Sequence, residues 1–315
     1  MKAAVVTSFD QPPRFTEFAE PRPGSDEILV DVLAAGLHPR VRAQADGSHY
    51  TSTGELPLVP GVDGVGRDPE GRLHYFVLDD TAFGAMAERT VIDARRSVVL
   101  SDDVDPVTVA AGANPALSSW VALRRRIAFE TGQSVLILGA TGSAGSMAVQ
   151  VARLFGASKI VAAGRDPERL AGLAELGATT TVRLGTDASA EELAREASDV
   201  DVVLDYVWGE LTTAAMTAIV TARPDRGRPL AWIEIGSVGG TTAAIPSAAL
   251  RAARLSLVGS GQGSVSTRDI VAELPGIATA ISSGRLRVDA HAVPLADVET
   301  TWADASSDAR VVFVP

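Results

Sequence analysis

Hydrophobic and polar positions follow two different patterns along the chain. In about the first hundred residues, β-rich runs are short and are separated by turn residues such as Asp46-Gly47 and Asp68–Gly71. These spacings are typical of short strands joined by tight turns, and they predict a compact, mostly antiparallel domain. The predicted strands are Ala3–Val6, Glu27–Ala34, Leu73–Leu78, Glu88–Ile92 and Ser97–Leu100.

From about Pro106 onward, helical runs alternate with short strands whose composition predicts that they are buried. Such alternation predicts βαβ units and a doubly wound parallel sheet. A last strand, Arg310–Pro315, follows the helical region and is expected to return to the first domain. The predicted strands are Ser134–Leu138, Lys159–Ala163, Thr180–Leu184, Val202–Asp205 and Leu230–Ile235, and the predicted helices are Ser143–Phe155, Pro167–Leu176, Ala190–Ala197 and Leu211–Val220.

A glycine-rich loop joins the strand Ser134–Leu138 to the helix that follows it. A dinucleotide fingerprint needs small residues for a tight turn, for close approach to the pyrophosphate and for helix–strand packing. Here Ala140, Gly142 and Gly145 take these three roles, and Ser143 and Ala144 begin the helix whose N–H groups face the phosphates. The alternative is a tight βα turn that binds nothing.

The end of the next strand distinguishes NADP from NAD. An acid about twenty residues after the loop would bind the ribose 2′-hydroxyl of NAD, but Gly164 and Arg165 stand there. A guanidinium suits a 2′-phosphate, so the sequence favours NADPH, with Arg169 as a second basic residue. Asp166 is interpreted as a helix N-cap before Pro167. The alternative is that both arginines line a solvated helix start.

The composition of the chain excludes several classes of function. The 315 residues include no Cys, which excludes disulfides, thiolate nucleophiles and Cys-ligated zinc, and is compatible with a cytoplasmic location. The net charge of −11 argues against a general nucleic-acid-binding surface. No apolar run is long enough to span a membrane, and the N-terminus does not suggest a signal peptide. Neither a P-loop nor a Tyr-x-x-x-Lys motif is present.

Six segments resemble the medium-chain dehydrogenase/reductase superfamily, in its zinc-independent quinone oxidoreductase branch. They are Ala34–Pro39, Pro60–Gly66, Leu117–Leu123, Gly139–Gly145, Asp205–Gly209 and Ile235–Gly240. The resemblance implies an α/β protein with a GroES-like, mostly β domain and a Rossmann domain. The expected boundaries are 1–112 with 285–315 for the GroES-like domain and 113–284 for the Rossmann domain.

The zinc positions of this superfamily fall on His38, Val62 and Asn114, and only His38 ligates zinc readily. Because a catalytic zinc needs three protein ligands, the sequence predicts no metal. Zinc-independent relatives usually carry Asn where His38 stands, so His38 is a departure. The resemblance places it beside the nicotinamide, where it could donate a proton or orient a carbonyl. The alternative is a packed or solvent-facing loop histidine.

Other residues acquire roles from the same resemblance. Tyr50 corresponds to a cleft tyrosine that could hydrogen-bond a substrate carbonyl, the alternative being an aromatic lid over the core. The resemblance places the remaining cofactor contacts after predicted strands or near the nicotinamide of the cofactor. The alternative is that these are ordinary loop residues without a role in binding. They are Ser118, Gly236, Ser237, Gly259 and Gly261.

Together these features predict hydride transfer from NADPH to a quinone or α,β-unsaturated carbonyl without a metal. Conjugated substrates tolerate the missing Lewis acid because they delocalise the developing charge. The edge strand Leu255–Val258 predicts a homodimer, by analogy with relatives. Two alternatives stay open: a zinc-type alcohol dehydrogenase or ketone reductase, and a non-catalytic NADPH-binding sensor.

Overall fold

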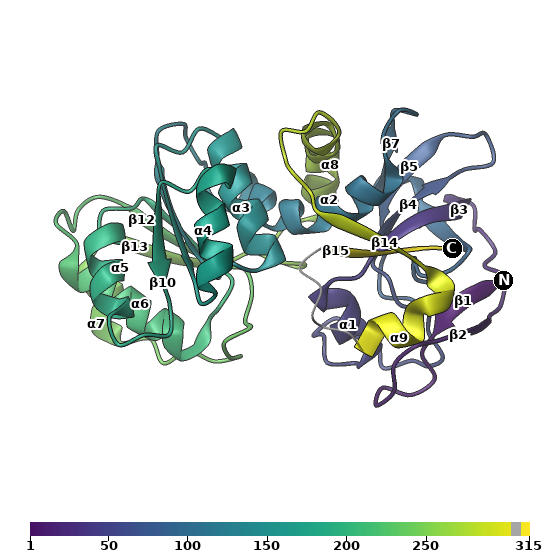
Figure 1. The fold of residues 1–315 in the computed structure, drawn as a ribbon, viewed down its shortest axis with the longest axis horizontal. Coiled ribbons are helices and arrows are strands. Elements are labelled where there is room, and N and C mark those ends of the chain that lie inside the picture. Colours follow the sequence, from purple (N-terminus) through teal and green to yellow (C-terminus); the bar gives the residue numbers. More distant parts are fainter. Residues whose placement is uncertain (304–309) are drawn as a thin grey trace. The chain divides into compact units, whose positions relative to one another are not determined.

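The structure, a computed structural model, describes residues 1–303 and 310–315. The chain divides into two compact units, residues 1–114 with 271–315 and residues 115–270 (Figure 1). Residues 113–114 and 271–284 are expected in the Rossmann domain from the sequence, whereas this division places them in the first unit. The physical reason is packing, since a β-carbon on Gly112 would lie only 2.5 Å from Val288 and 3.0 Å from Ile281.

The first unit is built on a mixed sheet with the order β14-β15-β3-β4-β5-β7, and β6 also pairs with β3. All pairs are antiparallel except β14 with β15. The return of the last strand to this sheet is confirmed, because Phe313 pairs with Ala35. The strands are β3 (Glu27–Gly36), β4 (Asp63–Arg67), β5 (Leu73–Val77), β6 (Arg89–Asp93), β7 (Ser97–Leu100), β14 (Ala290–Pro294) and β15 (Arg310–Val314), with β1 (Lys2–Val5) and β2 (Arg14–Glu17) forming a separate antiparallel pair.

Apolar side chains from these strands fill one core, which includes Val30, Val32, Phe76, Ile92 and Phe313. The helices around it are short or shared with the second unit. They are α1 (Pro39–Ala45), α2 (Pro106–Val121), α8 (Thr267–Ser282) and α9 (Val298–Ala303), with 3-10 turns at Ala94–Arg96 and Leu295–Asp297. The unit boundaries fall inside α2 and α8.

The second unit contains a six-stranded, all-parallel sheet with the order β10-β9-β8-β11-β12-β13. This is the doubly wound order 3-2-1-4-5-6, whose direction of winding reverses between β8 and β11. The strands are β8 (Ser134–Leu138), β9 (Lys159–Gly164), β10 (Thr180–Arg183), β11 (Val202–Asp205), β12 (Leu230–Glu234) and β13 (Leu255–Gly259). The parallel sheet expected from the alternating pattern is confirmed.

Helices flank this sheet (Figure 1). Helix α3 packs beside α4, while α5, α6 and α7 pack in succession. Their ends follow local chemistry: Asp166 caps α4 by accepting from the N–H groups of Glu168 and Arg169, with Pro167 in the first turn as expected. The helices are α3 (Ser143–Leu154), α4 (Pro167–Leu176), α5 (Ser189–Ala197), α6 (Gly209–Ala222) and α7 (Ser247–Ala252), with a π-helical turn at Ala122–Arg126.

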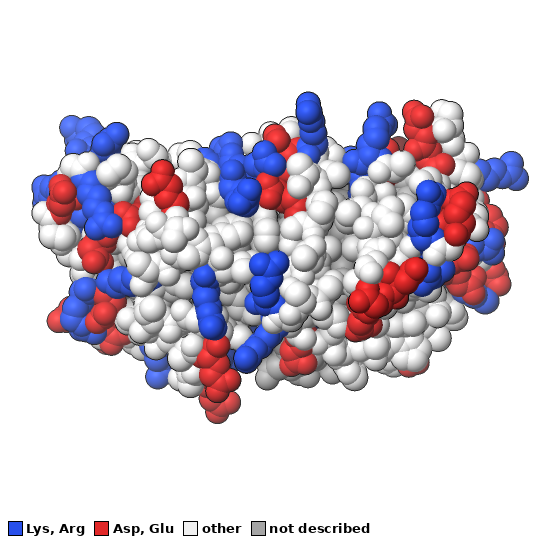
Figure 2. Space-filling view, turned by 90° about the horizontal axis from the view of Figure 1, so that it is seen from above, with Lys and Arg blue, Asp and Glu red and all other residues white. Residues whose placement is uncertain are grey.

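Charged side chains of both signs are interspersed on the face shown in Figure 2, so the excess of acid indicated by the net charge of −11 forms no single field there. Among the helices of the described residues, none has the length and apolar character needed to cross a membrane.

Candidate functional site

Most of the predicted cofactor residues follow the carboxyl ends of strands in the parallel sheet, whereas Ser118 lies in α2 and Arg169 in α4. Parallel strands all end at the same edge, and ligands of doubly wound sheets bind there, where the winding reverses. Strand β8 runs into the glycine loop, β9 into Arg165, and β12 into Gly236 and Ser237. Strand β13 ends at Gly259, close to Gly261. The second unit thus gathers these residues at the edge where a dinucleotide binds in this fold.

The loop between β8 and α3 has the shape that a pyrophosphate requires. The turn itself is made by Gly139, whose φ of 88° is left-handed, and not by Ala140 as the sequence analysis expected. The N–H groups of Gly139 and Ala140 both donate to the carbonyl of Ala163 at 2.9 Å. A β-carbon on Gly145 would lie 2.2 Å from the carbonyl oxygen of Gly139, so only glycine lets α3 approach the strand.

The N-terminus of α3 is open to an anion. Gly142 is the N-cap residue, so it has no side chain to cap the helix, and the first turn contains no acid. Gly142 and Ser143 are exposed, whereas Gly145 is buried. Uncapped N–H groups at the positive end of a helix dipole are a preferred position for phosphate. The residues present therefore fit the pyrophosphate of a dinucleotide.

At the end of β9, Gly164 is buried and Arg165 is exposed. A β-carbon on Gly164 would lie 2.4 Å from Cγ2 of Thr141, so the strand end and the glycine loop are in close contact. Arg169 donates to the carbonyl of Thr141 at 3.3 Å and lies 3.5 Å from Asp166. Arg169 therefore ties α4 to the loop, while the exposed Arg165 extends from the strand end where an acid would bind NAD.

Asp205 shapes the segment that follows β11. Its side chain is fully buried and accepts from the backbone N–H groups of Val207 and Trp208 at 2.9 and 3.0 Å. It also accepts from Thr212 Oγ1 at 2.6 Å. These bonds hold Trp208 at a φ of 55°, which is rare for a residue with a side chain. Asp205 thus positions the residues just beyond the strand.

Tyr206 is a residue that sequence reasoning missed, although its place directly after a buried strand is a usable signal. Its hydroxyl lies 3.0 Å from Oγ of Ser118, which also donates to the carbonyl of Pro115. Burial raises the pKa of Tyr206 to about 12 despite hydrogen bonds from Ser118 and Ser119. The phenol is therefore neutral at physiological pH, and it joins the predicted Ser118 to the sheet edge.

The loop after β13 is held by hydrogen bonds. Arg126 donates to the carbonyls of Gly259 and Ser264 at 2.7 and 3.0 Å. Ser264 Oγ accepts from the N–H of Gly261 at 2.8 Å. Arg126 and Ser264 therefore fix the backbone around Gly259 and Gly261, two of the cofactor positions expected from the sequence.

In the first unit, His38 is buried and hydrogen-bonded. Its Nε2 lies 2.8 Å from Oδ1 of Asp63, and the hydroxyl of Tyr75 donates to Oδ2 of the same carboxylate at 2.8 Å. Burial lowers the pKa of His38 and outweighs the opposing effect of Asp63. Arg310 lies near this carboxylate, and burial lowers its pKa to about 10. The hydrogen bonds of Asp63 with His38 and Tyr75 could not be predicted from the sequence, because only the fold pairs β4 with β5.

Tyr50 is 72% exposed, so it is not a lid over the core. Its ring stacks on His49 with centroids 4.4 Å apart. The segment that carries it is anchored to Asp80, which accepts from Arg40 and Gln44 at 3.0 Å and from the hydroxyl of Thr51. Burial and the charge of Arg40 lower the pKa of His49. The structure thus places His38 and Tyr50 at the two ends of one segment, with His38 bonded to Asp63 and the residue next to Tyr50, Thr51, bonded to Asp80.

The other two zinc positions of the superfamily contribute no side chain that readily holds a metal. Val62 is 1% exposed and belongs to the core of the first unit. Within the described ranges 1–303 and 310–315, no group of three or more His, Cys, Asp or Glu side chains is arranged to hold a metal ion.

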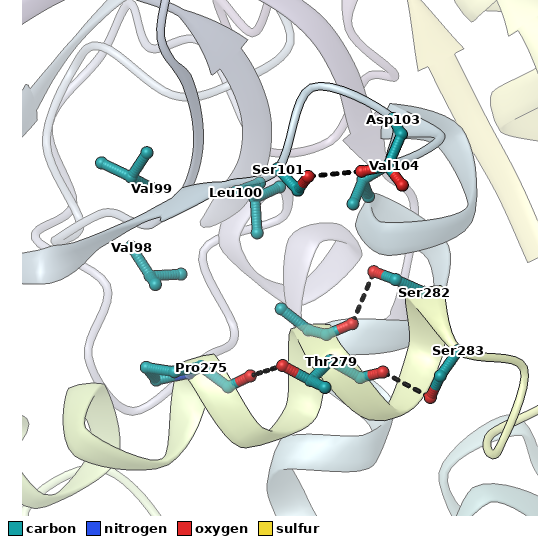
Figure 3. A pocket seen from close by; sticks show the side chains of 11 residues that line it. Val98, Val99, Leu100, Ser101, Asp103, Val104, Pro275, Thr279, Ser282 and Ser283 are labelled. Atoms are coloured by element: carbon teal, nitrogen blue, oxygen red, sulfur yellow. Dashed lines mark hydrogen bonds between the residues drawn. The ribbon is translucent and has the colours of Figure 1, made fainter.

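A groove of about 400 Å³ lies in the first unit between β7 and α8 (Figure 3). Its walls are largely apolar, with Val98, Leu100 and Pro275 facing it. The hydroxyls of Thr279 and Ser282 donate to carbonyls of their own helix at 2.8 and 2.7 Å. The groove contains none of the predicted site residues.

Comparisons with known proteins agree with this geometry. Residues 144–274 match the family model described as zinc-binding dehydrogenase. A probable NADPH-dependent quinone reductase of Emericella nidulans is 31% identical over 359 aligned positions, covering 100% of both chains. A chloroplastic NADPH-dependent alkenal/one oxidoreductase of Arabidopsis thaliana is 30% identical over 199 positions, covering 58% of this chain and 50% of the relative.

The solved structures include the quinone oxidoreductase of Thermus thermophilus, which was also determined in complex with NADPH. It is 26% identical to this chain, has a TM-score of 0.83 and is covered over 100% of both chains. The glycine loop, the doubly wound sheet and these full-length similarities lead to one conclusion: the chain belongs to the medium-chain dehydrogenase/reductase superfamily, in its quinone oxidoreductase-like branch.

Proposed function

We propose that this protein is an NADPH-dependent oxidoreductase that transfers a hydride to a quinone or an α,β-unsaturated carbonyl. The observation that carries the proposal is the end of β9. An exposed Arg165 follows a glycine packed against the phosphate loop, at the position where an acid would bind NAD. Relatives named as NADPH-dependent quinone and alkenal/one reductases support the same substrate class.

The chain's own residues bind and orient the reactants. The N–H groups at the start of α3 would hold the pyrophosphate, while Gly139 makes the turn and Gly145 lets α3 pack against the loop. Arg165 pairs with the 2′-phosphate, and Arg169 holds the loop to α4. When bound, NADPH supplies the hydride, and the protein supplies orientation and exclusion of water. The remaining predicted cofactor residues, Ser118, Gly236, Ser237, Gly259 and Gly261, border the same edge in this proposal.

We propose that the reaction needs no metal. Support comes from the side chains at the superfamily's zinc positions, where Val62 is apolar and His38 is already bonded to Asp63. A quinone or enone spreads the developing negative charge over its conjugated system, so hydrogen bonds suffice to stabilise it. The test compares the turnover of protein dialysed against a chelator with that of an untreated sample. The zinc content of both samples is measured as well. Loss of activity that returns with zinc would contradict this part of the proposal.

The main experiment follows NADPH oxidation by absorbance with a panel of quinones, enones, saturated ketones and alcohols. We expect turnover with the conjugated acceptors and little with saturated ketones. Repeating the panel with NADH tests the cofactor assignment. Tight NADPH binding without turnover on any acceptor would instead support a non-catalytic sensor, and activity confined to alcohols and simple ketones would support an alcohol dehydrogenase.

Arg165→Ala tests the residue that carries the proposal. Because one charge-assisted contact to the 2′-phosphate is lost, KM for NADPH should rise at least about tenfold, with little change for NADH. Arg195→Ala is the matched control, since Arg195 is an exposed arginine in the last turn of α5 and pairs with Glu196. Equal effects of Arg165→Ala on both cofactors would contradict its role.

We also propose a homodimer in the cytoplasm. Strand β13 is at the edge of the parallel sheet and carries the exposed Leu257, which fits edge-to-edge pairing with a second copy. The absence of cysteine is compatible with a reducing compartment. Light scattering of the purified protein tests the assembly, and Leu257→Asp should shift it toward monomer. A wild type that is monomeric at micromolar concentration would refute the dimer.

A further inference from the structure

The buried carboxylate of Asp63 lies between two hydrogen-bonding side chains from different elements. Asp63 begins β4 and is fully buried, Tyr75 on β5 is 1% exposed, and His38 precedes α1 and is 4% exposed. Strands β4 and β5 pair with Asp63 opposite Val77, which brings Tyr75 to the same region of the sheet. This arrangement leaves the imidazole of His38 little freedom to rotate, because one nitrogen is held by Asp63.

Which nitrogen of His38 carries the proton follows from its neighbours. Tyr75 donates its proton to Oδ2 of Asp63, and burial together with the charge of Asp63 raises the pKa of Tyr75 well above its usual value. The phenol therefore stays a donor. The nearby guanidinium of Arg310 balances the charge of the carboxylate, and it also donates to the carbonyl of Leu37 at 3.4 Å. An anionic carboxylate accepts only, so the 2.8 Å contact requires hydrogen on Nε2.

We propose that Asp63 is a positioning residue that fixes His38 in the Nε2–H tautomer, so that the imidazole offers an Nδ1 lone pair and not a proton to a bound hydroxyl or N–H group. Tyr75 supports this role by holding the second oxygen of Asp63. Applied to the reaction, the inference rests on the proposed function: His38 orients a donor group of the reactants, and water supplies the proton that the reduced product takes up.

The tautomer can be measured without any substrate, by ¹⁵N chemical shifts of the imidazole rings at neutral pH in uniformly labelled protein. The signals of His38 are those that disappear in His38→Asn. We expect wild type to show one protonated nitrogen, Nε2, and an unprotonated Nδ1. In Asp63→Ala the two tautomers should become mixed, and in the milder Tyr75→Phe the Nε2–H form should remain dominant.

Asp63→Asn covers the case in which Asp63→Ala fails to fold, because it keeps the shape of the side chain. Its amide removes the charge and should shift both ring nitrogens of His38. The second buried pair of the same unit supplies a matched control, since Nε2 of His74 lies 2.9 Å from Asp68. Asp68→Asn should move the signals of His74 and leave those of His38 unchanged. A wild-type ring protonated on Nδ1 or on both nitrogens would overturn the inference, and so would unchanged signals in both Asp63 variants.

Two substitutions of His38 separate the roles of its nitrogens in turnover. Asn places an amide atom near the position of Nδ1, whereas Gln reaches the position of Nε2 and keeps only the contact with Asp63. We expect His38→Asn to lose about two- to tenfold in kcat/KM, the worth of one ordinary hydrogen bond, and His38→Gln to lose more. A loss of about a hundredfold or more in His38→Asn is typical of a lost general acid and would overturn the inference. If none of the acceptors in the panel supports oxidation of NADPH by the wild type, the proposed function fails. The measurement of the tautomer is independent of that result.

Discussion

Oδ2 of Asp205 accepts a hydrogen bond from the indole Nε1 of Trp232 at 3.0 Å, which links the end of β11 to the neighbouring β12. Both side chains are fully buried. Together with the bonds from Thr212, Val207 and Trp208, this contact gives the carboxylate four donors. The edge of the sheet where we place the cofactor therefore depends on one buried acid.

Asp205→Ala is expected to destabilise the protein by about 3 kcal/mol or more, because it leaves buried donors without an acceptor. Thr212→Val removes only one of the four donors and should cost about 1 kcal/mol. Urea unfolding followed by tryptophan fluorescence and by circular dichroism measures both. A loss in Asp205→Ala no larger than that in Thr212→Val would show that the network is not cooperative.

Gly145→Ala should weaken NADPH binding by at least about tenfold, or about 1.4 kcal/mol. The added β-carbon would lie 2.2 Å from the carbonyl of Gly139, so α3 must move away from the loop. Titration of the protein with NADPH by fluorescence gives the dissociation constant. Gly172→Ala in α4 is the control: nothing lies within 4 Å of its added β-carbon, so it should keep the affinity and stabilise the helix by about 0.5–1 kcal/mol.

Asp68→Asn should lower stability at neutral pH by about 2 kcal/mol, and this difference should shrink in acid. Burial acts to raise the pKa of Asp68, but hydrogen bonds from His74 and Arg72 outweigh it and hold the pKa well below its usual value. A carboxyl group with a lowered folded-state pKa stabilises the fold above its unfolded pKa of about 3.9 and loses that contribution as the pH falls further. Unfolding of both proteins between neutral pH and about pH 3 measures the trend. A difference that is constant across this range would contradict the ionic role.

Asp80→Ala should loosen the segment that carries Tyr50. Without the acceptor for Arg40, Gln44 and Thr51, amide hydrogen exchange in residues 46–53 should accelerate by about tenfold or more. Exchange followed by mass spectrometry of peptides measures this. Asp79→Ala is the neighbouring control, because Asp79 is largely exposed and pairs with Arg96. Equal exchange in the two variants would show that Asp80 does not anchor the segment.

The sequence indicated the Rossmann unit in detail because its signals are local. An apolar pentapeptide, Ser134–Leu138, is buried throughout as β8, and Asp166 with Pro167 starts α4 at the expected place. The strands of the first unit were harder to predict from the sequence. Strand β4 contains glycines at 64 and 66, whose β-carbons would lie 2.8 and 2.9 Å from backbone oxygens of Ala34 and Asp31, so it lacks the alternating pattern of a strand.

Local sequence patterns also failed to predict the extent of two helices and the side-chain pairs of the site. Helices α2 and α8 contain Pro115 and Pro275 in their interiors, residues that normally end a helix, and tertiary packing overrides that preference. The pairing of His38 with Asp63 joins residues 25 positions apart, and that of Ser118 with Tyr206 joins residues 88 positions apart. No local pattern encodes such contacts, since they arise only when strands and helices are placed in the fold.

The contact between Gly164 and Thr141 limits how the coenzyme preference of this protein can be redesigned. Any side chain at position 164 would displace Thr141 from the phosphate loop, so an acid introduced there would impair binding of both coenzymes together. Position 165 is exposed and leaves the loop untouched. A switch toward NADH should therefore begin with an acidic residue in place of Arg165, which would repel a 2′-phosphate and accept from a 2′-hydroxyl.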